Sequence, residues 1–249
     1  MKFRVAGLSD VGRCRSLNQD RYLVDPTSGL YAVADGMGGH AAGEVASRMA
    51  IEALAQSMRR EEGSSWDDPA EAGRCLEQAL LEGNRKICES TEAHSEWRGM
   101  GTTIVAAVAV GNRLVIGHVG DSRAYLLRNG DLTQLTSDHS LVNEQVKMGL
   151  ITSEEAQRHP HRNIVTRALG NQPRVAVDLL EETVQAGDLI LLCSDGLNSM
   201  LDHAEIREAL HSHRNVPQTA CRALVDRANA RGGEDNITVV VLSPDGANS

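Results

Sequence analysis

The sequence has few aromatic residues and no long apolar run, and both features limit what it can form. Only 2% of its 249 residues are aromatic while 41% are hydrophobic, so the core must be aliphatic, built from Leu, Val, Ile and Ala. The longest apolar runs, such as TTIVAAVAV and LILLCS, fall far short of the roughly 18 residues that a membrane-spanning helix needs. The first residues, MKFRVAGLSD, contain no signal-peptide core. We therefore expect a soluble cytoplasmic protein without a membrane partner.

Positive charge and paired cysteines are also scarce. Lysine and arginine number 25 against 34 aspartate and glutamate residues, which gives a formal net charge of −9. This balance argues against nucleic acid as a partner. The cysteine count is odd and no pair has C-x-x-C spacing, which favours reduced thiols over a disulfide framework or a zinc site. These cysteines are Cys14, Cys75, Cys88, Cys193 and Cys221.

Apolar periodicity predicts an α+β fold in one domain. We expect strands near residues 3–8, 20–25, 30–34, 102–110, 113–120, 123–128, 188–193 and 237–242. We expect helices near residues 41–60, 68–92, 139–148, 153–158, 202–210 and 217–231. Short turns such as Gly111-Asn112 join the strands, and the helices are segregated from them, which indicates antiparallel layers rather than β-α-β alternation. No internal repeat or long linker interrupts the chain.

Aspartates lie at the ends of several predicted strands. Asp35 closes the run YAVA, Asp195 closes LILLCS, Asp121 lies between two strands, and Asp235 precedes the last one. Each alone is a common turn residue. If the strands are neighbours, however, the four carboxylates converge and repel unless a cation holds them. Oxygen ligands favour Mg²⁺ or Mn²⁺ over zinc, and the carbonyl of Gly36 can approach such an ion without a side chain in the way.

Positively charged residues that can bind an anion lie near the amino terminus. The stretch SDVGRCRSLNQDRY places Arg13, Arg15 and Arg21 close to Asp20. A guanidinium can hold a phosphate through two parallel hydrogen bonds, although each arginine taken alone is better explained as a solvated surface charge. Two hard cations held about 4 Å apart are a known means of binding a phosphoryl oxygen and activating a water. The pattern therefore favours phosphate chemistry.

Eight sequence blocks together resemble one protein family. In order they are GLSDVGRCRSLNQD, VADGMGGHAAGE, GTT, GHVGDSRAYLL, LTSDHS, IVTRALG, LILLCSDGL and GGEDNITVVVL. They span residues 4–242 and resemble the bacterial branch of the metal-dependent protein phosphatases, the PPM or type 2C family. The resemblance implies a four-layer α/β/β/α sandwich, with two central, mostly antiparallel sheets flanked by helix pairs. It also implies a single domain over residues 1–243, followed by a flexible tail at 244–249.

The resemblance implies a reaction as well. Members hydrolyse phosphoserine and phosphothreonine in proteins by direct attack of metal-activated water, with Mn²⁺ or Mg²⁺ as cofactor. By position, Asp35 would bridge two tightly bound metals, and the Gly36 carbonyl would bind one of them. Asp195 and Asp235 would hold the other metal. Asp121 would hold a weaker third one, shared with Asp195.

Further roles follow from the same resemblance. Arg15 would bind the substrate phosphate, with Arg13 the less favoured candidate, and Asp20 would act through metal-bound water. The partners would be phosphorylated proteins, among them a Ser/Thr kinase of the same cell and its substrates, and we expect a monomer. Residues 138–166 correspond to the family's flap, in which the basic stretch 158–162 either meets a phosphopeptide or is a plain solvent loop.

The sequence departs from the family pattern at two positions. Met37 stands where animal relatives carry the histidine that serves as general acid, so His40 or a metal-bound water is the candidate for this role. The alternative for His40 is a structural or helix-capping histidine. Gln19 replaces a common glutamate and brings no charge.

Two rival functions remain open. One is a relative that dephosphorylates anti-anti-sigma factors, which usually carries sensor domains. The other is a pseudophosphatase, which binds phosphoproteins without hydrolysing them and would typically lack one of the metal carboxylates.

Overall fold

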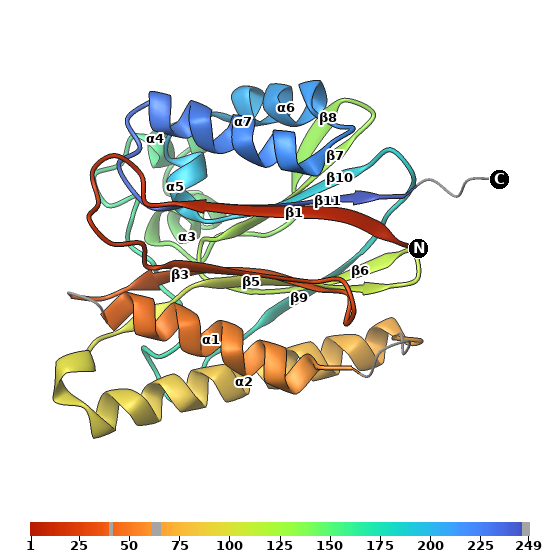
Figure 1. Cartoon of the computed structure of the whole chain (residues 1–249). Helices are drawn as coiled ribbons and strands as arrows, with labels where there is room; N and C mark the ends of the chain where they lie inside the picture. The colour runs from red at the N-terminus through yellow and green to blue at the C-terminus, as the bar shows by residue number, and fades with distance from the viewer. Residues whose placement is uncertain (40–41, 61–65, 246–249) are drawn as a thin grey trace.

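Two antiparallel β-sheets stacked face to face form the centre of the molecule (Figure 1). The structure is a computed structural model that describes residues 1–39, 42–60 and 66–245. The first sheet runs β1 (Phe3–Asp10), β11 (Ile237–Pro244), β10 (Leu189–Cys193), β7 (Arg123–Arg128), β8 (Asp131–Gln134). The second sheet runs β2 (Asp20–Asp25), β3 (Leu30–Met37), β5 (Ile104–Val110), β6 (Arg113–Val119), β9 (Asp178–Thr183), and the short β4 (Gly101–Thr102) pairs with β3.

Helices cover both outer faces of this sandwich. In Figure 1, α1 (Ala42–Met58) and α2 (Pro69–Ala93) lie below the second sheet, and α6 (His203–Ser212) and α7 (Pro217–Ala230) lie above the first. The one-turn helix α5 (Asp195–Asn198) and the 3₁₀ turn η1 (Ser95–Trp97) complete these layers. The predicted α/β/β/α architecture with its flanking helix pairs is therefore confirmed. No helix within the described residues is long and apolar enough to cross a membrane.

Strand β3 shows why the run YAVA precedes Asp35. Side chains alternate between the two faces of a strand. Tyr31 and Val33 face the core between the sheets, whereas Leu30, Ala32 and Ala34 face the core beneath α1 and α2. Because both faces are covered, the strand is apolar throughout, and the alanines let the helix pair lie close to the sheet.

The structure corrects several predicted boundaries. The strand predicted at 102–110 is divided at Thr103 into β4 and β5. The two parts pair with β3 in one register, and the Thr103 N–H still donates to the carbonyl oxygen of Asp35 at 2.9 Å. Pro244, predicted as the first residue of the tail, instead pairs with Phe3 at the end of β11, and residues 246–249 lie outside the described residues. Strands β8 and β9 were not predicted. In β9 the acidic sequence DLLEET disfavours a strand by composition, yet it forms the edge of the second sheet.

The segment 138–166 leaves and returns to the sandwich at nearly the same point. It contains α3 (Leu141–Lys147) and α4 (Ser153–Gln157). At its base, the N–H of Leu141 donates to the carbonyl of Ile164 at 2.9 Å, and the N–H of Thr166 donates to the carbonyl of His139 at 2.8 Å. These two hydrogen bonds hold the two ends of the segment together, so that it forms a compact loop beside the sheets.

Candidate active site

The strand register brings three of the predicted aspartates to one end of the first sheet. Cys193, the last residue of β10, pairs with both β11 and β7. Asp195 follows Cys193 by two residues, Asp121 precedes β7 by two residues, and Asp235 precedes β11 by two residues. Because neighbouring strands are antiparallel, the end of β10 and the starts of β7 and β11 lie at the same edge.

The second sheet supplies two more carboxylates at this end. Asp20 at the start of β2 lies directly opposite Asp35 near the end of β3. In Figure 1 this end of the sandwich lies opposite the labelled chain termini. The carboxyl of Asp35 interacts electrostatically with those of Asp20, Asp195, Asp121 and Asp235. The five acidic residues named from the sequence therefore form one cluster, called the acidic cluster below.

Burial and mutual repulsion disfavour the charged state of this cluster. Burial raises the pKa of Asp20 to about 7, and the charges of Asp195 and Asp235 act in the same direction. Burial, and then the charge of Asp195, likewise raises the pKa of Asp121 to about 7. Burial, followed by the neighbouring carboxylates, raises the pKa of Asp35 well above its ordinary value. A bound cation would relieve this repulsion and favour the ionised forms.

The donor atoms of the acidic cluster fit a hard divalent cation. Among the described residues, Asp20 Oδ1 and Asp195 Oδ1 are buried oxygen atoms without a hydrogen-bond partner in the protein. Buried polar atoms are normally satisfied, so partnerless carboxylate oxygens facing other carboxylates indicate a ligand. The carboxylate-only donor set suits Mg²⁺ or Mn²⁺ better than zinc.

Hydrogen bonds from neighbouring residues fix the positions of Asp20 and Asp35 in the acidic cluster. The hydroxyl of Ser194 donates to Asp20 Oδ2 at 2.8 Å and accepts the backbone N–H of Thr238 at 3.0 Å. The carbonyl of Asp35 accepts from the hydroxyl of Thr102 at 2.8 Å. The sequence reasoning did not identify these supporting residues. Their signal lay in the blocks themselves, since Ser194 precedes Asp195 directly and Thr102 lies in the block GTT.

Arg15 and Arg21, which flank Asp20 in the sequence, have different environments. Arg15 Nη2 donates to Asp235 Oδ2 at 2.8 Å, which places its guanidinium at the edge of the acidic cluster. Arg21 instead pairs with Glu44 of α1 at 2.6 Å and donates to the carbonyl of Asp20 at 2.8 Å. Of these two, Arg15 is therefore the one that lies where an anion next to the cluster would bind.

Gly36 is constrained by packing as well as by its place beside Asp35. A Cβ atom at Gly36 would lie 2.0 Å from the carbonyl oxygen of Gly43 in α1 and 2.6 Å from that of Gln19. The backbone of β3 thus touches the backbone of α1 directly. Access for a metal is the reason for glycine that the sequence suggests, and this close packing is a second, independent reason.

His40, the candidate general acid, lies outside the described residues. Met37, which occupies the position of the family's histidine, ends β3 and is half-buried. Gln19, the other departure, donates its backbone N–H to Asn236 Oδ1 at 2.8 Å, so its main chain is fixed next to the residue that follows Asp235.

A cavity of about 650 Å³ opens beside the acidic cluster. Asp121 and Asp195 line one side of it, and residues of the segment 138–166 and of α5 and α6 line the others. A larger cavity of about 1010 Å³ lies elsewhere, between Phe3, Trp66 and Arg113, and its described lining contains none of the five aspartates. Because Asp121 and Asp195 line it, the smaller cavity is the candidate substrate-binding site.

Comparison with known proteins matches this arrangement to one family. A family model described as protein phosphatase 2C matches residues 13–232. The chain belongs to the protein phosphatase 2C family.

Relatives are similar to this protein in sequence and structure along nearly the whole chain. The serine/threonine phosphatase stp of Listeria monocytogenes is 42% identical over 240 residues, which cover 95% of this chain and 94% of that protein. A crystal structure of the serine/threonine phosphatase PstP/Ppp of Mycobacterium tuberculosis has a TM-score of 0.89 and 41% identity, covering 98% of this chain and 100% of that one. A structure of the PstP catalytic domain in complex with two manganese ions has a TM-score of 0.84 and 41% identity, covering 97% of each chain.

Proposed function

We propose that the protein is a metal-dependent protein serine/threonine phosphatase, a hydrolase of phosphoserine and phosphothreonine in proteins. The observation that carries this proposal is the acidic cluster, with two buried oxygen atoms that have no partner within the described protein. Membership of the 2C family supports it. The relatives' names, serine/threonine phosphatase stp and PstP, point to the same reaction.

Two Mn²⁺ or Mg²⁺ ions are the cofactors in this proposal. Asp35 and the Gly36 carbonyl would hold one, Asp35, Asp195 and Asp235 would hold the other, and Asp121 and Asp195 would hold a weaker third ion. The two manganese ions of the PstP catalytic domain support the first two sites. When bound, such ions activate a water molecule and neutralise the phosphoryl oxygens.

The protein's own groups then bind and orient the reactants. Arg15, which already reaches the cluster through Asp235, binds the phosphate in line with the attacking water. Asp20, fixed by Ser194, directs its second carboxylate oxygen towards the site and orients water there. In this assignment both residues position the reactants and neither forms a covalent bond with phosphorus.

His40 is the proposed general acid for the serine or threonine leaving group. A nitrophenyl phosphate needs no such acid because its leaving group is already stable as an anion. His40→Ala should therefore leave turnover of the activated ester largely intact and slow that of a phosphopeptide. Equal losses on both substrates would assign His40 a structural role instead.

The partners and the location form a further part of the proposal. Phosphorylated proteins are the substrates, among them a Ser/Thr kinase and its targets, and the enzyme acts as a monomer in the cytoplasm. A single domain covers the predicted residues 1–243 and also Pro244, the last residue of β11, and its flap, residues 138–166, borders the cavity beside the acidic cluster. The cysteines, all of them free, support a reducing compartment.

Phosphate release from a phosphothreonine peptide tests the proposal. We would compare the wild type with Asp195→Ala, in Mn²⁺ and in EDTA. The matched control is Asp226→Ala, the same change at an exposed position of α7. We expect turnover that requires Mn²⁺ and is lost only in the Asp195 variant. Binding of the peptide without turnover in any metal would refute the proposal and identify a phosphoprotein-binding protein.

A further inference from the structure

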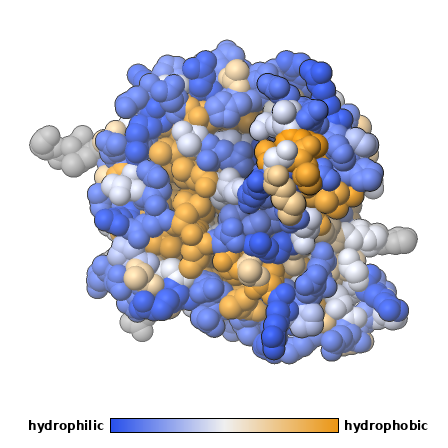
Figure 2. Space-filling model, turned by 180° about the vertical axis from the view of Figure 1, so that it is seen from behind, coloured by the Kyte–Doolittle hydropathy of each residue, from blue (hydrophilic) through white to orange (hydrophobic). Residues whose placement is uncertain are grey.

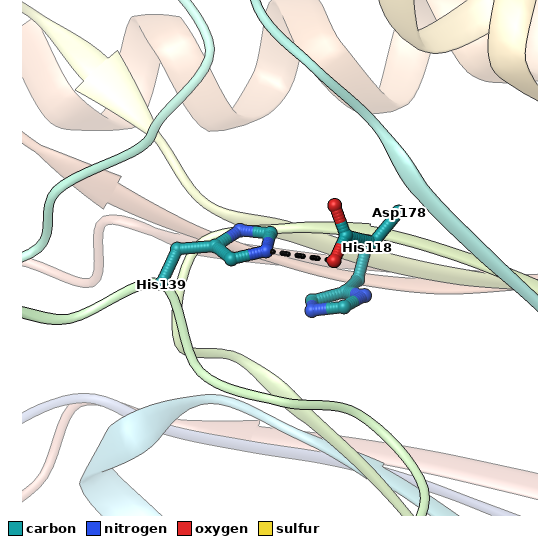
Figure 3. Close-up of side chains that lie close together, drawn as sticks. All are labelled: His118, His139 and Asp178. Atoms are coloured by element: carbon teal, nitrogen blue, oxygen red, sulfur yellow. Dashed lines mark ion pairs between the residues drawn. The ribbon is translucent and has the colours of Figure 1, made fainter. Parts of the chain in front are cut away.

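A second group of titratable residues contacts Gly120, the residue before Asp121, and Figure 3 draws its three side chains. His118 comes from β6, His139 from the start of the segment 138–166, and Asp178 from the start of β9. The two histidines are 2% and 4% exposed, and their rings stack with centroids 4.6 Å apart. His139 Nε2 lies 3.3 Å from Asp178 Oδ2, the contact drawn as a dashed line in Figure 3. One nitrogen or oxygen atom from each residue lies within 4.8 Å of the others.

These residue types are those of a metal site, but hydrogen-bonding neighbours already occupy both ring nitrogens of His139. The backbone N–H of Gly120 donates to His139 Nδ1 at 3.0 Å, so Nδ1 carries no proton. In the neutral ring the proton is then on Nε2, which lies 3.3 Å from Asp178 Oδ2 and 3.0 Å from Arg167 Nη1. Of these two neighbours only Asp178 can accept the proton. A metal ligand needs a lone pair on this nitrogen, and in this tautomer His139 offers none, whereas His118 Nδ1 has no hydrogen-bond partner within the described protein. His118 likewise uses its Nε2 proton, which it donates to the carbonyl of Ser137 at 3.2 Å.

The network acts on the turn that carries Asp121. His139 makes a second bond to the same residue, because its backbone N–H donates to the carbonyl of Gly120 at 2.9 Å. Gly120 has φ +108°, which side-chain-bearing residues rarely adopt. A Cβ there would lie 2.5 Å from Thr103 Cβ. His139 therefore holds both backbone polar groups of a glycine whose conformation other residues rarely adopt, immediately before a residue of the acidic cluster.

The neighbouring residue of the same segment holds the other side of Asp121. Arg123 donates from Nε to Asp138 Oδ1 at 2.9 Å and from Nη2 to Asp138 Oδ2 at 2.6 Å. Residues 138 and 139 thus fix the chain on both sides of Asp121. The carbonyl of His139 also accepts the N–H of Thr166, so the same residue ties Asp121 to the end of the segment 138–166.

We propose that His139 is a positioning residue, whose Nδ1 holds Gly120 so that the Asp121 carboxylate is oriented for a divalent cation. Asp178 keeps the proton of His139 on Nε2, and Arg167 orients Asp178 by donating to Oδ1 at 2.6 Å. Burial, and then His118, lowers the pKa of His139 to about 4, so the ring is neutral and Nδ1 stays an acceptor. The inference rests on the proposed role of Asp121 as a metal ligand.

The tautomer is tested directly by long-range ¹H–¹⁵N spectra of the histidine rings. We expect a protonated Nε2 and an unprotonated Nδ1 for His139, assigned by comparison with a His139→Asn variant. A proton on Nδ1 would overturn the proposal, because Gly120 then has no acceptor. This measurement needs neither metal nor catalytic activity.

Two substitutions at position 139 separate positioning from mere filling of space. The oxygen of Asn can occupy the place of Nδ1, whereas the longer side chain of Gln reaches towards Asp178 and offers no acceptor near Gly120. Mn²⁺ binding is counted from the electron paramagnetic resonance signal of free Mn²⁺. We expect His139→Gln to weaken the weakest Mn²⁺ site about tenfold, and His139→Asn to weaken it less than about threefold. Equal effects in both variants, or no effect in either, would overturn the proposal.

Two further variants distinguish a failure of the inference about His139 from a failure of the proposed metal ligand Asp121. If Asp121→Asn binds Mn²⁺ like the wild type, the proposed ligand fails and the inference fails with it. If Asp121→Asn loses a site that His139→Gln retains, the inference alone fails. Should His139→Gln not fold, Asp178→Ala replaces it, because the Asp178 side chain is 45% exposed. Its expected effect is a weakening of the same site by about threefold, and an unchanged site would count against the role of Asp178.

Discussion

The substitution Ser194→Ala removes a single hydroxyl group, yet it should destabilise the folded protein strongly. Ser194 is fully buried and links the two sheets, because its hydroxyl donates to Asp20 Oδ2 at 2.8 Å and accepts the N–H of Thr238 at 3.0 Å. Asp20 Oδ1 already lacks a hydrogen-bond partner among the residues that the structure describes. The variant would therefore leave a buried N–H unsatisfied and a buried carboxyl less well bonded.

The magnitude follows from these two bonds. A hydrogen bond to a charged group contributes about 1.5–3 kcal/mol, and a buried unsatisfied N–H costs about 1–3 kcal/mol. Since both bonds share one hydroxyl, they do not add fully, and we expect a loss of about 3 kcal/mol in the free energy of unfolding. For a chain of this length, that corresponds to a fall in Tm of about 6–9 °C.

Urea unfolding and thermal melting measure this loss, in EDTA and in Mn²⁺. Ser28→Ala is the matched control, because Ser28 is also buried but its hydroxyl accepts only a long bond, from the Arg60 N–H at 3.4 Å. We expect the control to lose less than about 1 kcal/mol. A Ser194 variant that is no less stable than the Ser28 variant would refute the reasoning.

Three further outcomes are expected. Gly196→Ala should prevent stable folding, because its Cβ would lie 2.0 Å from the backbone carbonyl oxygen of Asn236, and the yield and urea midpoint report this. Arg15→Ala should lower kcat/KM for a phosphopeptide about 10–100-fold, mainly through KM, because charge-assisted hydrogen bonds to the phosphate are lost, while Mn²⁺ dependence remains. Cys193 should resist alkylation at pH 9 until the protein unfolds, because burial raises the pKa of its thiol to about 12, and mass spectrometry of native and unfolded samples checks this.

Each of these has a control within the chain. Gly73→Ala, on a helix where the nearest atom to a new Cβ is 3.5 Å away, should raise stability by about 0.5–1 kcal/mol. Arg13→Ala should leave kcat/KM within about threefold, and a larger loss than for Arg15 would reassign phosphate binding. Cys14, which is exposed, should react in the native protein. Labelling of Cys193 at the same rate would show that its core opens readily.

The layers were predictable because the periodicity of buried strands and helices reflects packing on both faces. The position of the acidic cluster was also predictable, since residues at the ends of paired antiparallel strands must meet. Asp20 opposite Asp35 follows directly from the β2–β3 register. The resemblance, rather than periodicity, supplied the four-layer order and the role of each ligand.

The parts that were missed depend on contacts between distant segments. The sequence DLLEET does not by itself predict the strand β9, because pairing with β6 overrides its acidic composition. Thr102 and Thr103 bond to the Asp35 carbonyl, more than 60 positions earlier in the chain. The bond between Gly120 and His139 connects two loops whose sequences are unremarkable when read apart. Such pairings arise from the folded geometry and leave no periodic trace.

The pairing of Phe3 with Pro244 has a practical consequence. Both residues lie at the end of the sandwich remote from the acidic cluster (Figure 1). An affinity tag, a fluorescent protein or a solid support joined at the amino terminus would therefore hold the molecule by its base. Immobilised in this way, the protein would present its opposite end to passing phosphoproteins, an orientation that suits surface-based assays of capture and release.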